Sequence, residues 1–228
     1  MFHRKSFAHS NNVNFFFWFK FFNIRIYFFK AFYYGVHMFV FKKKYLLIIE
    51  TTKDIDLKNI KKTSKFIVIY RNLGKKEKID NLNNFRRVCR SKKIKFLIAN
   101  DFNLARSIDA DGIYLSASNR SLKIIRYKKN NFLVIGSAHD YKDINLKEKQ
   151  GCKIILLSKL FHVSYKPNEA HLGINRFNSF VVNFSKKIIP LGGINNSNLN
   201  KLKIIKSEGL AILSEIKKKP AKIISRLL

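Results

Sequence analysis

Residues 94–116, IKFLIANDFNLARSIDADGIYLS, decide the fold, because they hold two apolar runs separated by a short amphipathic segment. The first run, Ile94–Asn100, and the second, Gly112–Ser116, are continuous in hydrophobicity rather than alternating. Strands that are buried on both faces show this pattern, and a helix between two such strands is typical of a parallel βαβ unit. The stretch therefore predicts one repeat of a parallel α/β fold.

The same unit recurs from Lys42 to the end of the chain, with little spacer between repeats. Eight apolar runs are expected to be strands: Tyr45–Glu50, Lys65–Arg71, Ile94–Asn100, Gly112–Ser116, Phe132–His139, Lys153–Phe161, Lys187–Ile194 and Gly209–Ile216. Eight strands with helices between them predict a single-domain α/β fold, a TIM-type (β/α)8 barrel, over residues 42–228. A doubly wound open sheet is the alternative, although it usually needs fewer units.

The amphipathic stretches between the runs are expected to be helices, and the clearest is Glu77–Lys92. Its apolar residues share one helical face, opposite the charges: Ile79, Leu82, Phe85 and Cys89. At the end of the chain, Pro220 predicts a helix start, and Ala221–Leu228 would be a helix after the eighth strand. Every strand is thus expected to be followed by a helix.

Residues 1–41 form a basic aromatic extension that differs in kind from the barrel. They hold 13 of the 22 Phe and the only Trp, and no acidic residue precedes Glu50. Basic residues interrupt the apolar stretch, so no uncharged run reaches the roughly 18 residues of a transmembrane helix, and no small-residue cleavage site follows. We expect either an interfacial segment that contacts a membrane or a mis-assigned start, because Met38 lies just before the first predicted strand.

The chain carries 46 Lys+Arg against 14 Asp+Glu, a formal net charge of +32. Such a charge attracts polyanions, but the basic residues are spread along the chain, and compositional drift of a whole genome would raise Lys, Asn, Ile and Phe together. With no recognition motif in the barrel portion, we expect no nucleic-acid partner. Two cysteines, Cys89 and Cys152, are too few for a disulfide-stapled scaffold or a four-thiolate zinc site. Reduced thiols and a cytoplasmic location are expected.

A barrel of this type places its active site at the carboxyl ends of the strands and in the loops after them. The residues at these positions are Arg71, Asn100, Asp101, Ser116–Asn119, Ser137, His139, Phe161–Lys166, Gly192, Gly193, Leu213 and Ser214. Gly192 and Gly193 lie at the end of the seventh run, where barrels commonly bind a phosphate on backbone N–H groups. Since a missing Cβ lets a phosphoryl oxygen approach closely, we expect a phosphate there; a tight turn without a ligand is the alternative.

Five segments resemble, in order and spacing, the thiamine phosphate synthase/TenI family. They are Ala99–Asp101, Ala110–Leu115, Ile135–His139, Leu191–Asn195 and Gly209–Ser214. The resemblance covers nearly all of Tyr45–Ile216 and implies a barrel enzyme of thiamine biosynthesis. The synthase joins a hydroxymethylpyrimidine diphosphate to a thiazole phosphate with Mg²⁺ and releases pyrophosphate. TenI-type members instead aromatise the thiazole phosphate by moving a proton.

The resemblance implies roles for the residues that follow the strands. Arg71 would pair the diphosphate through charge-assisted hydrogen bonds, and Asn100 would bind the same substrate. Asp101 matches a Mg²⁺ carboxylate, although a helix cap is its other interpretation, and Asn119 stands at the second metal position without a negative charge. Two positions that are polar or charged in the family are apolar here: Ile69 and Leu73.

The loop after the sixth run departs most from the family. Residues 158–166 stand where the family reads Gly-Pro-x-Phe-Pro-Thr-x-Thr-Lys, and Val163 and Tyr165 replace the two threonines that contact the thiazole phosphate. Lys166 remains at the position that would neutralise the departing pyrophosphate. These losses predict a weakened enzyme.

Two further positions bear on which reaction survives. Ser137 matches a hydroxyl that contacts the pyrimidine diphosphate, and His139 matches the histidine that TenI-type members use as a proton shuttle. Histidine titrates near neutrality and suits that task, although a structural histidine is the alternative. Gly192, Gly193, Leu213 and Ser214 complete the implied substrate-binding set.

Taken together, these residues favour a Mg²⁺-dependent transferase that acts on a phosphorylated pyrimidine and a phosphorylated thiazole. The alternatives are a TenI-like thiazole tautomerase that uses His139 without metal, and a catalytically degenerate barrel that only binds a phosphorylated ligand.

Overall fold

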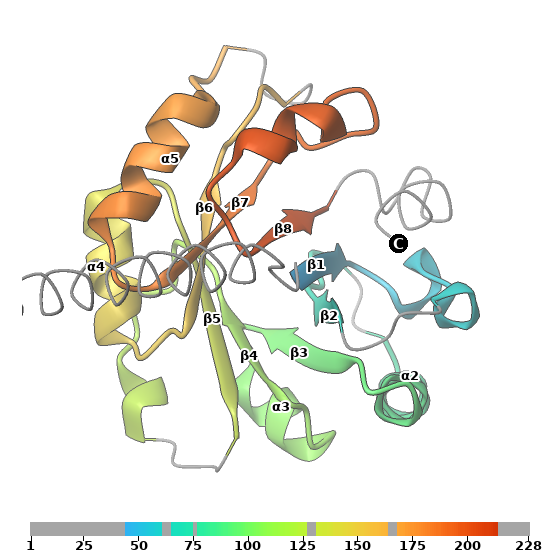
Figure 1. Ribbon diagram of the computed structural model, residues 1–228. Coiled ribbons are helices and arrows are strands. Elements are labelled where there is room, and N and C mark those ends of the chain that lie inside the picture. The colour runs from blue at the N-terminus through green and yellow to red at the C-terminus, as the bar shows by residue number, and fades with distance from the viewer. Residues whose placement is uncertain (1–43, 61–64, 75–76, 127–130, 164–167, 214–228) are drawn as a thin grey trace, which may run out of the picture. The chain divides into compact units, whose positions relative to one another are not determined.

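The computed structural model describes residues 44–60, 65–74, 77–126, 131–163 and 168–213. In this part of the chain eight parallel strands pair in sequence order and β8 pairs with β1, so the barrel is closed (Figure 1). The strands are β1 (Lys44–Ile49), β2 (Phe66–Tyr70), β3 (Lys95–Ala99), β4 (Gly112–Leu115), β5 (Leu133–Ala138), β6 (Ile154–Ser158), β7 (Lys187–Leu191) and β8 (Gly209–Ile212). The predicted TIM-type barrel is confirmed.

Two apolar layers hold the barrel together, because alternate residues of each strand face opposite sides. The interior is filled by a cluster of side chains that includes Leu46, Ile48, Ile69, Leu97 and Tyr114. The outer layer packs against the surrounding helices and turns. Ile69, an apolar residue at a position that is polar in the resembled family, is 0% exposed and belongs to this interior packing.

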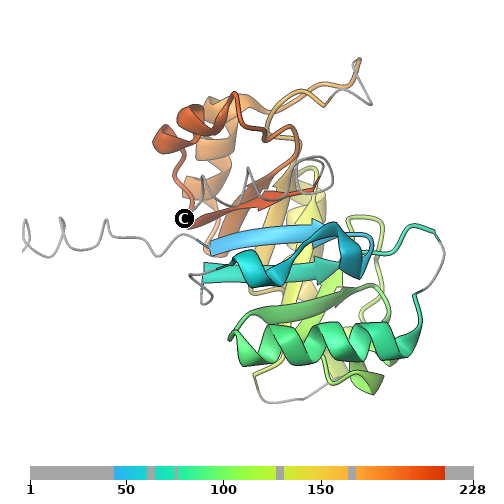
Figure 2. The same ribbon diagram turned by 90° about the vertical axis from the view of Figure 1, so that its right-hand side faces the viewer.

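Four α-helices lie among the described residues: α2 (Ile79–Ser91), α3 (Phe102–Ser107), α4 (Tyr141–Lys149) and α5 (Gly173–Asn183). Figure 1 shows α2 and α3 on one side of the barrel and α4 and α5 on another. The turned view of Figure 2 shows α2 running alongside the strands at the start of the barrel, where it contacts β3. Within the described ranges, no helix is long and apolar enough to cross a membrane.

The expectation that every strand precedes an α-helix is wrong for β1, β4 and β7. Short 3-10 turns follow these strands: η1 (Thr52–Asp54), η2 (Leu57–Asn59), η4 (Lys123–Arg126) and η5 (Leu199–Ile204). In two of these connections, short polar side chains accept backbone N–H groups, which competes with helix formation. The Asp54 carboxylate accepts from Glu50 at 2.7 Å, and the Asn195 side chain accepts from Ser197 at 3.0 Å.

The predicted helix over Glu77–Lys92 is confirmed with nearly the expected bounds. Leu82 and Cys89 are buried on it as expected, whereas Ile79 is 54% exposed because it is the first residue of α2 and lies at the edge of a cleft. The aromatic extension and the expected helix over Ala221–Leu228 lie outside the described residues.

Candidate active site

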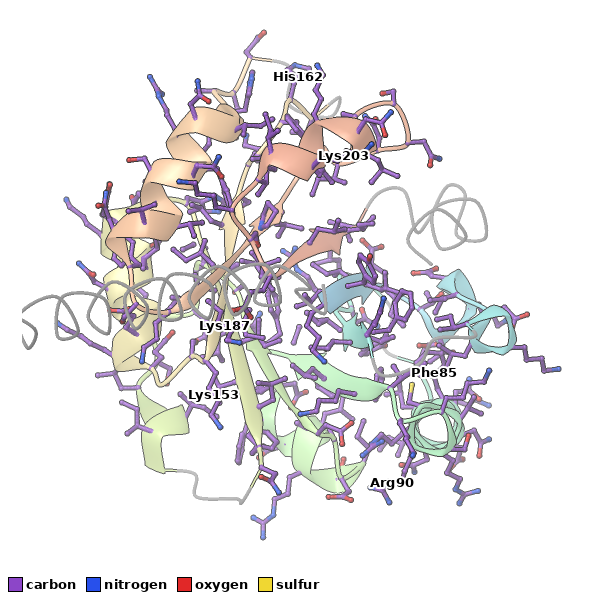
Figure 3. All side chains as sticks on the ribbon, in the orientation of Figure 1. Phe85, Arg90, Lys153, His162, Lys187 and Lys203 are labelled. Carbon is purple, nitrogen blue, oxygen red and sulfur yellow. The ribbon has the colours of Figure 1, made fainter. Side chains whose placement is uncertain are left out.

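A cavity of about 290 Å³ lies at the carboxyl ends of the barrel strands. Of the residues with an implied catalytic or substrate-binding role, five line it together: Arg71, His139, Gly192, Gly193 and Leu213. They come from the loops after β2, β5, β7 and β8, so strands that are far apart in sequence contribute to one site. In Figure 3, His162 marks the loop after β6, whereas Lys153 and Lys187 lie where β6 and β7 begin.

The turn after β7 requires glycine at Gly193. This residue has a φ of +69°, and a Cβ would lie 2.5 Å from the carbonyl oxygens of both Phe161 and His162. The loop after β6 is held against the turn by backbone hydrogen bonds, including Phe161 N–H to the Gly192 carbonyl at 3.1 Å. The result is a tight, glycine-lined wall of the cavity, the surface that a phosphate needs to reach backbone amides.

His139 is exposed at the cavity and its ring is held on one side. Its Nδ1 atom lies 3.1 Å from both the carbonyl oxygen and the hydroxyl of Ser158. Because a carbonyl only accepts, this contact favours the proton on Nδ1 and the lone pair on Nε2. The backbone N–H of His139 donates to the carboxylate of Asp143 at 3.0 Å, which fixes the start of this loop. The histidine can therefore serve as a general base through Nε2.

Sequence reasoning missed Lys159, which lines the same cavity. Its side chain is only 12% exposed, and its ammonium donates to the carboxylate of Glu169. The family pattern has proline at this position and its lysine at the position of Lys166, so no signal in the sequence pointed to Lys159. Lys166 and Ser214 themselves lie outside the described residues.

Ser137 does not line this cavity but contacts Tyr114, which does. It is 5% exposed, and its hydroxyl hydrogen-bonds the phenol of Tyr114, a 1% exposed residue that lines the cavity floor. Burial raises the pKa of Tyr114, an effect opposed by the hydrogen bond with Ser137 and by the charge of Arg71. Ser137 therefore contacts the site through Tyr114.

Asn100 and Asn119 form a second polar group, after β3 and β4. Asn100 has a φ of +59°, and its Oδ1 accepts from the Ser116 backbone N–H at 2.9 Å and from the Asn119 amide at 3.2 Å. The two asparagines line a separate cavity of about 550 Å³. The structure thus brings the two asparagines together, but in a different cavity from Arg71 and His139. We call Asn100 and Asn119 the asparagine wall.

Asp101 is the N-cap of α3, and its Oδ1 accepts from Leu104 N–H at 2.9 Å. It lines a cleft of about 820 Å³ between α2 and α3, together with Leu73, whereas Asn119 lines the neighbouring cavity. In the described ranges no three His, Cys, Asp or Glu side chains are grouped to hold a metal. Mg²⁺ commonly takes one or two carboxylates plus substrate phosphates and water, so Asp101 fits this ion only with a diphosphate as co-ligand.

Comparisons with known proteins agree with this architecture. A family model described as thiamine monophosphate synthase matches residues 47–216. A thiamine-phosphate synthase of Prochlorococcus marinus is 28% identical over 130 residues, 57% of this chain and 38% of the relative. One from Clostridioides difficile is 24% identical over 149 residues, 65% of this chain and 71% of the relative. Against the Prochlorococcus relatives, the chain spans well under half of their length.

Solved structures share the fold at low sequence identity. Thiamine phosphate pyrophosphorylase from Pyrococcus furiosus has a TM-score of 0.60 at 17% identity, covering 82% of this chain and 98% of that chain. 3-Hexulose-6-phosphate synthase from Salmonella typhimurium has a TM-score of 0.53 at 13% identity, covering 81% and 98%. These likenesses show the barrel, and the family model covers most of it. The chain therefore belongs to the thiamine phosphate synthase/TenI family.

Proposed function

We propose that this protein is a transferase that joins a hydroxymethylpyrimidine diphosphate to a thiazole phosphate and releases pyrophosphate. The observation that carries the proposal is the cavity in which Arg71, Lys159 and the Gly192–Gly193 turn meet at the carboxyl ends of the strands. Two cations and a glycine turn suit a site for phosphorylated groups. Family membership and relatives named thiamine-phosphate synthase support the same reaction class.

The two substrates would bind to different groups of residues. The thiazole phosphate would lie on the Gly192–Gly193 turn, and the diphosphate would lie toward Arg71 and Asn100. The 290 Å³ cavity matches one small ligand at the lower end of ordinary sites, so the second substrate would extend over the neighbouring asparagine wall.

The reaction would break the bond between the pyrimidine methylene and the diphosphate oxygen, and form a bond from that methylene to the thiazole nitrogen. Arg71 would stabilise the negative charge that develops on the departing pyrophosphate, with Lys166 as a further proposed contributor. Lys159, which lies beside Gly192, would neutralise the thiazole phosphate. Mg²⁺, held by Asp101 and the diphosphate, would supply additional charge neutralisation.

The test is direct. Purified protein is mixed with both phosphorylated precursors and Mg²⁺, and thiamine phosphate and pyrophosphate are quantified. Formation of both products in equal amounts, with a large loss of rate in Arg71→Met, is expected. Absence of both products from folded protein would contradict the transferase.

A second candidate is thiazole tautomerisation, favoured by the held orientation of His139. Its Nε2 would take and return one proton without a metal. In that case turnover of the thiazole phosphate alone would survive EDTA and fail in His139→Asn, whereas Arg71→Met would have little effect.

A further inference from the structure

Lys147, on α4, is 0% exposed and makes three hydrogen bonds. Its ammonium donates to the carbonyl oxygens of Ser116 and Asn119, each at 2.7 Å, and to Oε1 of Gln150 at 3.0 Å. An ammonium has three donors, so each one is used. Burial lowers the pKa of Lys147, while Cys152 and Asp143 oppose this shift and Arg120 adds to it. A lysine at this depth is rare unless its charge is well satisfied.

Gln150, which is 1% exposed, extends the same contact. Its Nε2 donates to the carbonyl oxygens of Asn119 and Ser121, both at 2.9 Å. We call residues 116–121, which follow β4, the β4 loop. Lys147 and Gln150 together therefore hold three carbonyl groups of the β4 loop against α4.

The neighbouring strand is shaped to admit the lysine stem. A Cβ on Gly136 would lie 2.7 Å from Cδ of Lys147 and 2.8 Å from Sγ of Cys152. Because these are clashes within a packed interior, glycine in β5 and the buried lysine in α4 fit as a pair.

The side of the β4 loop that faces away from Lys147 contacts Asn100. Its Ser116 backbone N–H and its Asn119 amide both donate to Oδ1 of Asn100, at 2.9 and 3.2 Å. Ser116 and Asn119 therefore accept hydrogen bonds from Lys147 through their carbonyl oxygens and donate hydrogen bonds to Asn100. By contrast, the Gly192–Gly193 turn contacts the loop after β6 and receives none of these hydrogen bonds from α4.

We infer that Lys147, assisted by Gln150, is a positioning residue: it holds the β4 loop so that Asn100 and Asn119 present their amides to the diphosphate. The inference rests on the proposed function for the identity of that ligand. It predicts that loss of Lys147 weakens the diphosphate side of the site and leaves the thiazole phosphate side intact.

The experiment compares Lys147→Met with Lys149→Met in the full chain. The first change keeps an apolar stem beneath Gly136 and removes all three donors, while Lys149 is an exposed residue of the same helix. Hydrogen exchange of the β4 loop amides and KM for each substrate are measured. Lys147→Met is expected to speed loop exchange and raise the KM for the diphosphate, each by about tenfold, with the KM for thiazole phosphate within about twofold. Lys149→Met is expected to match the unmodified protein.

Gln150→Leu provides a second variant: it removes the two hydrogen bonds from Gln150 to the β4 loop and keeps those from Lys147 to Ser116 and Asn119, so the same selective changes are expected at about threefold. Unchanged exchange in the β4 loop, or equal increases in both KM values, would overturn the inference. If the unmodified protein makes no thiamine phosphate, the proposed function fails instead. In that case hydrogen exchange of the β4 loop and the affinity for inorganic pyrophosphate, measured by calorimetry, test the role of Lys147. Faster exchange with weaker pyrophosphate binding in Lys147→Met would support that role, and no change in either would overturn it.

Discussion

Lys159 donates a hydrogen bond to the carboxylate of Glu169 in the cavity that also contains the Gly192–Gly193 turn. The charge of this lysine is therefore balanced by a carboxylate of the protein itself. An anionic group that binds at the glycine turn must compete with that carboxylate for the ammonium.

Glu169→Gln is therefore expected to tighten the binding of inorganic phosphate by about tenfold, and Lys159→Met to weaken it by a similar factor. Calorimetry at two salt concentrations measures both, and the gain is expected to shrink as salt rises. Glu208→Gln is the matched control, because it removes the partner of Lys187 at the start of β7. Weaker binding in Glu169→Gln would show that the ion pair shapes the site rather than competing for it.

Asp101 offers a test that separates a metal ligand from a helix cap. Asn caps a helix about as well as Asp but lacks the charge, whereas Ala loses the cap at a cost of about 1 kcal/mol. Asp101→Asn is expected to keep the free energy of unfolding and lose most Mg²⁺-dependent turnover, as EDTA would. Full turnover in Asp101→Asn, with loss of stability only in Asp101→Ala, would leave Asp101 as a cap alone.

Two substitutions toward the family pattern are expected to strengthen a weakened synthase. Leu73 is 64% exposed in the cleft that Asp101 lines, so Leu73→Lys adds a cation without disturbing packing. Asn119→Asp adds a carboxylate and keeps an acceptor for Ser121 N–H, but loses the donor to Asn100.

We expect Leu73→Lys to tighten pyrophosphate binding, and the double variant to lower the Mg²⁺ concentration needed for half-maximal rate. One charge-assisted contact contributes about 1.5–3 kcal/mol, or roughly tenfold to a hundredfold in affinity. Metal titrations of the rate measure the effect. A lower rate and a weaker metal dependence in the double variant would indicate a site reshaped for another phosphorylated substrate.

A chain that begins at Met38 is expected to fold and to keep the activity of the full chain. The first strand begins at Lys44, and all eight strands of the barrel lie beyond Met38. Thermal unfolding and ligand affinity measure this, and an insoluble product would show that the aromatic extension belongs to the fold. If the extension is interfacial, only the full chain binds anionic vesicles, less tightly once salt shortens the Debye length to about 8 Å.

Stability is expected to fall at alkaline pH because of Cys89. Burial raises the pKa of this thiol from 9.0 to about 12. Between these values the unfolded chain releases the proton and the folded chain keeps it, so unfolding becomes more favourable as pH rises above 9. Cys89→Ala is expected to reduce that slope by about 1.4 kcal/mol per pH unit in urea unfolding. Leu82→Ala, a buried change on the same helix, would lower stability with the slope unchanged.

The strands could be predicted from the sequence because continuous apolar runs leave few other structures. The 3-10 turns could not, since they depend on which side chains capture backbone N–H groups, as Asp54 does for Glu50. Ile79 has the helical spacing of a core residue, but its place at the first turn of α2 exposes it. Periodicity shows which residues share one face of a helix. It does not show whether another element of the fold covers the first turn of that helix.

The candidate site was predicted in part for a similar reason. Arg71, His139 and the Gly192–Gly193 turn could be predicted from their positions at the ends of strands, because the carboxyl ends of the parallel strands lie at the same end of the barrel. Lys147 resembles an exposed lysine in sequence, and only the packing of α4 on β5 shows that it is buried. The separation of Asp101 from Asn119 into different cavities likewise depends on loop conformation.

Closure of the barrel also bears on how this chain avoids aggregation. Each of its apolar strands would template another chain if its edge were unpaired, and a closed barrel has no such edge. The contact between β7 and β8 rests on one register pair, Leu191 with Ala211, whereas β1 and β2 share five. This seam has the shortest register of the eight neighbouring strand pairs, and opening the barrel there would present the edges of β7 and β8 to neighbouring molecules.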